Sequence, residues 1–433
     1  MKQIHKDIFA IALPVSAGML SQNLMSLVDT YMVGPLGKHA LAALGLGAFI
    51  FYLCFAVTIG FSTAVQSETV KRSPDMDTGP LFSALLFLVV TMPFATLFLY
   101  FAMPWLLTFY DGDAHVVDET TNYLQMRFLG IAFVAMSFSF RGYWTALGQA
   151  RIFLITVLVM HACNIALNYV FIHGNFGMPA MGVSGAGFAS AISAFIGCMV
   201  YVVFLFARLP RPLKRSPLAI KPLLTIAIPY GMQQLSVGMG MVVLFAMIGL
   251  IGTAQLAAAT VVTNISLFVV MPGIGIGIAA VTISGREIRQ NRFDNVAANM
   301  NQVVKLAVVL FMLAGLPMWL MPEMLLGMFI DDAETLSLAV IPLVITGLAL
   351  AIDAIVLICN QSLFIVGQGK KWVFTIIALQ WLVLFPSVYY FCVLLGYPFY
   401  LVWVIKVLIS VIQAFIASAL WRKGIVQLEA QAV

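Results

Sequence analysis

Apolar runs of about 20 residues or more follow one another along almost the whole chain, separated by short charged or Pro/Gly-rich breaks. A helix needs about 20 apolar residues to cross a bilayer, so each run predicts a membrane span. Only 9% of the 433 residues are charged, against roughly 25% in a soluble protein, which leaves no room for a soluble domain. We therefore expect an all-α polytopic membrane protein with twelve helices, over residues 8–33, 41–67, 81–109, 121–148, 151–173, 183–208, 222–251, 255–284, 302–329, 336–366, 372–395 and 399–421.

Lysine and arginine gather in alternate loops and near both chain ends. These basic residues are Lys2, Lys6, Lys71, Arg72, Arg151, Arg208, Arg211, Lys214, Arg215, Lys221, Arg286, Arg289, Arg292, Lys370, Lys371, Arg422 and Lys423. The opposite loops carry mainly acids, namely Asp111, Asp113, Asp118, Glu119, Glu323, Asp331, Asp332 and Glu334. Basic loops face the cytoplasm, so we expect an inner-membrane protein with both termini inside. The net charge of +5 reflects this bias, and no nucleic-acid partner is expected.

The chain repeats itself at an offset of 215 residues. AIALP at residues 10–14 recurs as TIAIP at residues 225–229, and Gly34 falls on Gly249 at the same offset. We expect two six-helix lobes, residues 1–208 and 222–433, joined by a basic cytoplasmic linker over residues 209–221. Six helices per half give both lobes the same orientation, and such parallel repeats recur in secondary transporters that work by alternating access.

Asp29 is a carboxylate near the end of the first apolar run. Because successive helical residues turn by about 100°, Gln22, Ser26 and Asp29 fall within one polar stripe. A charge buried in hydrocarbon is expensive, so an intramembrane acid is a functional candidate by default. We predict a cation-coupling site at Asp29 with Ser26, and a substrate-cleft role for Gln22.

The fifth predicted helix carries polar residues that can lie near Asp29. His161, Asn164 and Asn168 are spaced so that they share one helix face. Amides can bind a cation such as Na⁺ through oxygen or hydrogen-bond a carboxyl, so we predict that Asn164 and Asn168 complete the Asp29 site. The alternative is polar contact that only holds helices together. His161 is a candidate for the substrate cleft.

The second half has its own intramembrane acid, Asp353, between Thr346 and Asn360 on one helix stripe. We predict a second-lobe polar site from these three residues. The seventh helix adds two further cleft candidates, Gln233 and Gln234. Lys406 either pairs with an inward acid or extends to the membrane surface, and its role stays open.

The remaining patterns indicate packing rather than cofactor binding. All five cysteines fall inside predicted helices, none with metal-ligand spacing, so no cofactor is expected. GIGIG at residues 273–277 lies mid-helix after Pro272 with no strand before it. It favours close helix packing or a flexible break over a nucleotide loop.

These features together resemble the multidrug and toxic compound extrusion (MATE) family, in its bacterial NorM/DinF-like branch. The resemblance is carried in order by Pro14, DTYMVGPLG (29–37), ALAALGLG (40–47), NIALNY (164–169), DAIVLICNQSLFIVGQG (353–369) and Trp381 to Pro386. It implies a V-shaped, two-lobe, monomeric exporter that antiports organic cations or amphipathic drugs against H⁺ or Na⁺. The family's helix 1 acid matches Asp29, its helix 5 pair matches Asn164 and Asn168, and its helix 10 acid matches Asp353.

One departure bears on the coupling ion. The sodium-coupled NorM-like branch carries a glutamate in helix 7, where this chain offers Gln233, Gln234 and Ser236. A lone carboxylate among neutral amides then favours a proton over sodium. The alternative function is a flippase for lipid-linked oligosaccharides or lipids, although intramembrane basic residues are few. An intramembrane enzyme is disfavoured, because there is no GxSxG motif and no nucleophile and base at interacting spacing.

Overall fold

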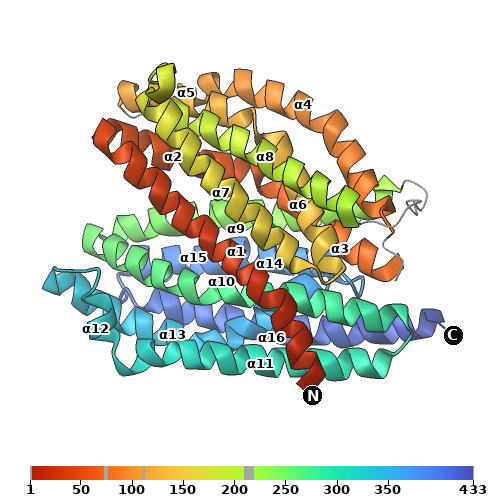
Figure 1. Ribbon diagram of the computed structural model, residues 1–433. Helices are drawn as coiled ribbons and strands as arrows, with labels where there is room; N and C mark the ends of the chain where they lie inside the picture. Colours follow the sequence, from red (N-terminus) through yellow and green to blue (C-terminus); the bar gives the residue numbers. More distant parts are fainter. Residues whose placement is uncertain (1, 73–76, 110–112, 209–218, 433) are drawn as a thin grey trace. The chain divides into compact units, whose positions relative to one another are not determined.

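The computed structural model describes residues 2–72, 77–109, 113–208 and 219–432, and the regular structure of these residues is entirely helical (Figure 1). The first half contains α1 (Lys2–Val33), η1 (Gly34–Leu36), α2 (Lys38–Ala56), η2 (Val57–Ile59), α3 (Gly60–Arg72), α4 (Gly79–Leu107), α5 (Ala114–Phe128), α6 (Ile131–Ala146), α7 (Ala150–His173), η3 (Asn175–Gly177) and α8 (Val183–Arg208). The second half contains α9 (Ile220–Ile251), α10 (Thr253–Arg289), α11 (Phe293–Leu320), α12 (Pro322–Leu326), α13 (Ala333–Ser362), α14 (Gly369–Ala378), η4 (Leu379–Leu384), α15 (Phe385–Val388), η5 (Tyr389–Leu394) and α16 (Leu401–Ala432).

The predicted all-α membrane fold is confirmed. Within the described ranges, 11 helices are long and apolar enough to cross a membrane, and the bent pair α5 and α6 brings the number to 12. These two helices meet at 51° across Leu129 and Gly130, where the sequence predicted one continuous helix. Linker residues 209–218, with Arg211, Lys214 and Arg215, and the loop acid Asp111 lie outside the described residues.

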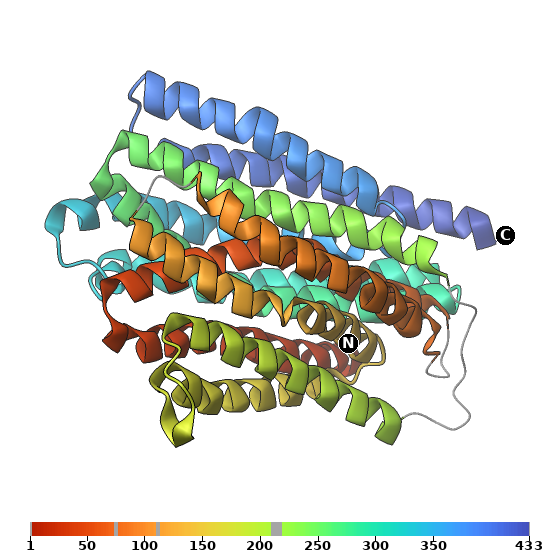
Figure 2. The same ribbon diagram turned by 90° about the horizontal axis from the view of Figure 1, so that it is seen from above.

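The chain divides into two compact units. The N-terminal unit comprises residues 17–231, and the C-terminal unit comprises residues 1–16 and 232–433. In the N-terminal unit α8 packs against α5, α6 and α7, and in the C-terminal unit α13 packs against α10, α11 and α16. Within each unit the axes of the long helices are roughly aligned, as a second view also shows (Figure 2). Both unit boundaries fall inside helices, two residues after Pro14 in α1 and two after Pro229 in α9.

The same close backbone contact occurs once in each unit. A Cβ added to Gly60 would overlap the carbonyl oxygen of Ala227, within the N-terminal unit. A Cβ added to Gly275 would come within 2.7 Å of the carbonyl oxygen of Ala12, within the C-terminal unit. Both pairs are related by the 215-residue offset of the sequence repeat. The first segment of each half is therefore packed into the unit formed mainly by the other half. Gly275 belongs to GIGIG, and its contact fits the close packing predicted for that segment.

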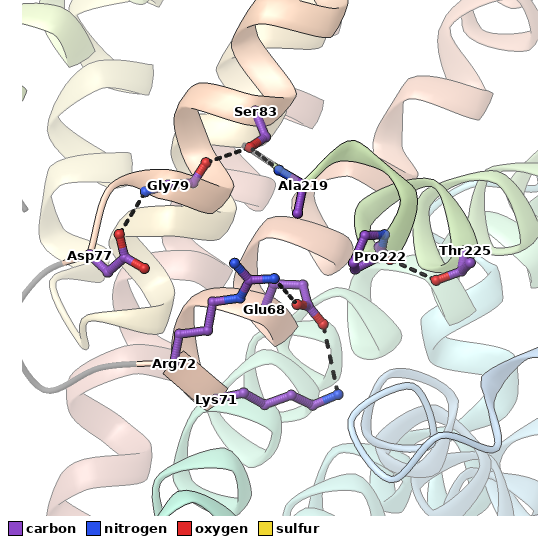
Figure 3. A network of polar contacts seen from close by, with 9 residues as sticks. All are labelled: Glu68, Lys71, Arg72, Asp77, Gly79, Ser83, Ala219, Pro222 and Thr225. Atoms are coloured by element: carbon purple, nitrogen blue, oxygen red, sulfur yellow. Dashed lines mark hydrogen bonds and ion pairs between the residues drawn. The ribbon is translucent and has the colours of Figure 1, made fainter. Parts of the chain in front are cut away.

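Polar contacts hold the start of α9 within the N-terminal unit (Figure 3). The amide of Ala219 donates to Oγ of Ser83 at 3.2 Å, and that hydroxyl donates to the carbonyl of Gly79 at 2.8 Å. The first turn of α4 is itself fixed, because Asp77 accepts from the amide of Gly79 at 2.9 Å. The chain that leaves the linker is thus tied to α4 before it becomes α9.

The basic end of α3 carries its own counter-charge. Glu68 forms ion pairs with Arg72 at 3.1 Å and with Lys71 at 3.9 Å (Figure 3). Both are pairs of neighbouring turns on one helix, and such surface pairs contribute little stability. They reduce the net positive charge of a loop that the sequence assigned to the cytoplasm.

One acid in each half of the chain caps a helix. Asp113 accepts from the amide of His115 at 2.8 Å at the start of α5, and Asp332 accepts from the amide of Thr335 at 2.9 Å at the start of α13. These backbone hydrogen bonds hold the pKa of both exposed carboxyls below the usual aspartate value. The acidic side of the repeat therefore has a structural role in starting helices.

Candidate functional site

Asp29 and Asn168 are in direct contact in the N-terminal unit. Asp29 lies in the last turns of α1, and Nδ2 of Asn168 in α7 donates to its Oδ1 at 2.6 Å. Asn168 is fully buried, whereas Asp29 is half-buried. The amide nitrogen therefore supports a carboxylate that remains accessible from one side.

Asn164 joins this contact from the preceding turn of α7. With its amide nitrogen facing Asp29, it donates to Oδ1 at 3.1 Å and its oxygen accepts from Oγ and the backbone nitrogen of Ser190 in α8, at 3.1 and 3.2 Å. This orientation gives the nitrogen a carboxylate acceptor and the oxygen two donors, and it replaces the contact in which Nδ2 of Asn168 donates to Oδ1 of Asn164 at 3.1 Å. One carboxylate oxygen then faces two amide nitrogens. The structure thus brings Asp29, Asn164 and Asn168 together.

A cavity of about 580 Å³ opens beside Asp29, with walls from α1, α2, α5, α6, α7 and α8. Gln22, Ser26 and His161 line it with Asp29. Ser26 is exposed and has no contact with Asp29 among the hydrogen bonds of the described residues. His161 shares a hydrogen bond of 2.8 Å between its Nδ1 and Oγ of Ser21. The volume lies within the roughly 300–1,000 Å³ typical of small-molecule sites.

Arg127 is a charged residue of this cavity to which the sequence gave no site role. It lines the cavity from α5, with its guanidinium carbon 4.7 Å from the ring centre of Phe51 and 5.9 Å from that of Tyr123. It is close enough to act electrostatically on Asp29, and its buried Nε has no hydrogen-bond partner among the described residues. The carboxylate is therefore not surrounded by neutral groups alone. An arginine inside an apolar run was the signal available in the sequence.

The C-terminal unit separates the three residues predicted as one polar site. Asp353 is hydrogen-bonded by Ser410 and attracted by Lys406, both in α16. Thr346 donates to the carbonyl of Pro342 in its own helix at 2.8 Å. Lys406 is thus close enough to act electrostatically on an inward acid.

Asn360 belongs to a different contact from that of Asp353. Its Oδ1 accepts from Nε2 of Gln233 in α9 at 2.7 Å and from Nε1 of Trp372 in α14 at 2.8 Å. Gln233 is buried, so this cleft candidate is engaged inside the unit. Gln234 is half-buried next to it.

A further polar contact joins α9 to the π-helical turn η4. Nε1 of Trp381 donates to Oγ of Ser236 at 2.8 Å. Single π-helical turns inside helices are frequent at functional sites, and the sequence reasoning identified Trp381 only as part of the family resemblance. Among the described residues no group of three or more His, Cys, Asp and Glu side chains could hold a metal ion.

A family model described as MatE matches residues 14–170 and again residues 229–390. The two matches together cover well over half of the chain. The chain belongs to the MatE family. The matches begin at Pro14 and Pro229, so the MatE model recognises the same 215-residue repeat that the sequence displays. Membership makes this chain a transporter rather than an enzyme.

Relatives and solved structures agree with the MatE assignment. The chain is 31% identical over 363 residues to the multidrug resistance protein NorM of Burkholderia vietnamiensis, covering 77% of this chain and 75% of that one. It is 27% identical over 379 residues to a probable multidrug resistance protein NorM of Agrobacterium fabrum, covering 81% and 79%. An outward-facing multidrug resistance MATE family transporter of the MOP superfamily has the same fold, with a TM-score of 0.86, 19% identity, and coverage of 99% and 97%.

Proposed function

We propose that this MatE protein is a secondary active exporter that antiports small organic molecules against protons by alternating access. The observation that carries the proposal is that Asp29, which lines the 580 Å³ cavity, accepts a hydrogen bond from the buried Asn168. It joins one ionisable group to a volume that fits a drug-sized molecule. The names of the NorM relatives support drugs as substrates.

The groups around Asp29 favour a proton over sodium as the coupling ion. Sodium needs several oxygen ligands, as hard cations do. Here Asn168 turns its nitrogen toward Oδ1, and Asn164 does so in the orientation that satisfies its own amide. Arg127 adds a positive charge nearby, which opposes a second cation. A Na⁺ site at Asp29, Asn164 and Asn168 would require both amides to turn.

In the proposed cycle, a proton from outside neutralises Asp29, which releases the substrate and permits the change to the inward-open state. Loss of the proton to the cytoplasm restores the charge, and the next substrate binds. Exchange requires that proton and substrate each favour a different state. The cavity residues Gln22 and His161 are placed to contact the substrate.

The flippase alternative has one observation in its favour, since Arg127 lines the cavity and arginine binds phosphate well. A pyrophosphate-linked lipid carries more negative charge than this single arginine balances. The cavity is also of drug size. We therefore retain the drug exporter as the proposal.

The coupling ion is tested in everted vesicles that contain the protein. With a pH gradient alone, acid inside, uptake of a fluorescent organic cation should occur and a protonophore should abolish it. With sodium inside and equal pH on both sides, uptake should stay at the level of vesicles without the protein. Robust sodium-driven uptake that resists the protonophore would contradict the proton assignment. Absence of uptake under both gradients would contradict the antiporter proposal.

We also propose that both termini face the cytoplasm of a bacterial cell. Lys and Arg at both chain ends and in alternate loops support this orientation. A single cysteine introduced at Lys423, in a variant without the five native cysteines, should resist an impermeant maleimide in intact cells. The same cysteine should react after permeabilisation. Labelling in intact cells would reverse the assigned topology.

A further inference from the structure

Arg141 carries a charge deep inside the N-terminal unit. It lies in α6, is 8% exposed, and donates from Nε to Oγ of Ser62 in α3 at 3.1 Å, which is its one hydrogen bond to the described residues. Its guanidinium carbon lies 4.8 Å from the ring centre of Phe138 and 5.8 Å from that of Phe153. No carboxylate of the described chain forms an ion pair with it. A buried charge of this kind is costly unless an opposite charge is supplied.

A second cavity adjoins this arginine. It has a volume of about 90 Å³ and is lined by Arg141, Ser137, Thr156 and Tyr201, among others. Oγ of Ser137 is buried and has no hydrogen-bond partner among the described residues. The hydroxyl of Thr156 already donates to the carbonyl of Ile152 at 2.9 Å. The guanidinium group of Arg141 and the unpartnered hydroxyl of Ser137 therefore belong to residues that line one small cavity.

The size and the charge together indicate the ligand. A volume of about 90 Å³ has room for several water molecules or for a small ion. Water would satisfy N–H groups but would leave the arginine charge uncompensated. One arginine balances one negative charge, and its planar fork matches a carboxylate.

The small cavity lies beside the large one. Gln22, Phe138 and Met160 line both. A molecule in the 580 Å³ cavity could therefore reach Arg141 with an acidic group. We propose that the cavity beside Arg141 and Ser137 binds a small monovalent anion, either a free halide ion or the carboxylate of a molecule seated in the large cavity.

The halide source is tested on the purified full-length protein in detergent. Its melting temperature is measured in sodium bromide and in sodium gluconate at equal ionic strength. Bromide should raise the wild-type melting temperature with saturation. Ser137→Ala should weaken the apparent bromide affinity roughly tenfold, as expected for one hydrogen bond to a charged ligand. Arg141→Gln should abolish the response, and Arg141→Lys should keep part of it.

Ser139→Ala is the matched control. Ser139 lies two residues away in α6 and also has a buried Oγ without a partner among the described residues, but it does not line the cavity. It should leave the bromide response unchanged. The serine pair keeps the test decisive if Arg141→Gln does not fold.

The carboxylate source, which alone rests on the proposed export function, is tested by equilibrium binding in gluconate. A fluorescent aromatic carboxylic acid should bind at least tenfold more tightly than its methyl ester, and Ser137→Ala should remove most of that difference. A bromide response identifies a free ion, and acid preference without one identifies the carboxylate of a bound molecule. If wild type shows neither, or if both persist equally in Ser137→Ala and Arg141→Gln, the proposal is wrong. Neither measurement needs a gradient, so a failure of anion binding can be told apart from a failure of export in vesicles.

Discussion

Asp29→Asn is expected to abolish proton-driven export while leaving the amount of protein in the membrane unchanged. The amide has nearly the shape of the carboxyl group but cannot take up or release a proton. It also places a nitrogen or a neutral oxygen where Asn168 now donates to a carboxylate oxygen at 2.6 Å. Uptake into everted vesicles under a pH gradient should fall to the level of vesicles without the protein, which is a loss of well over tenfold.

The control is Asp118→Asn, which makes the same chemical change at an exposed acid of α5 that does not line the cavity. It should retain wild-type uptake. A second measurement tests the cycle itself: because neutral Asp29 releases the substrate in that cycle, movement of preloaded substrate down its own gradient should also be slowed in Asp29→Asn. Wild-type drug resistance of Asp29→Asn cells at equal expression would overturn the assignment of Asp29.

The long helices were predictable because the bilayer imposes both their length and their apolar composition. The bend between α5 and α6 was not. Gly130 at the bend lies against the backbone of Ala191 in α8, where a Cβ would come within 2.6 Å of Cα. That contact depends on how α8 packs, and a window of local sequence contains no information about it.

The Asp29 site was predictable for a similar local reason. Asn164 and Asn168 are four residues apart on one helix, so helical periodicity alone placed them on one face. The position of Arg127 depends on six helices that meet around a cavity, and periodicity could not supply it. Asp353 and Asn360 share a stripe of α13, yet their partners come from different helices, Lys406 from α16 and Gln233 from α9. A stripe predicts which face of a helix is polar but not which neighbours complete it.

Local patterns also could not predict that the first residues of α1 belong to the C-terminal unit and those of α9 to the N-terminal unit, although the repeat contained the information. Gly60 and Gly275 are related by the same 215 residues that relate Ala12 and Ala227. Each glycine admits the carbonyl of an alanine from the start of α1 or α9. The contact therefore recurs because the two halves fold alike, and its recurrence indicates that close backbone approach is required at both sites.

Gly60→Ala is accordingly expected to destabilise the protein, although alanine is the better helix former by about 1 kcal/mol. The added methyl group would meet the backbone oxygen of Ala227, which cannot move away as a flexible side chain can. Overpacking of this kind typically costs about 1–3 kcal/mol, so we expect a net loss and a lower apparent melting temperature in detergent. Gly275→Ala should behave in the same way. Gly249→Ala, where the nearest neighbour is the Leu256 side chain at 3.7 Å, should not lower the melting temperature. If Gly60→Ala melts at a temperature no lower than that of Gly249→Ala, the start of α9 is not packed closely against Gly60.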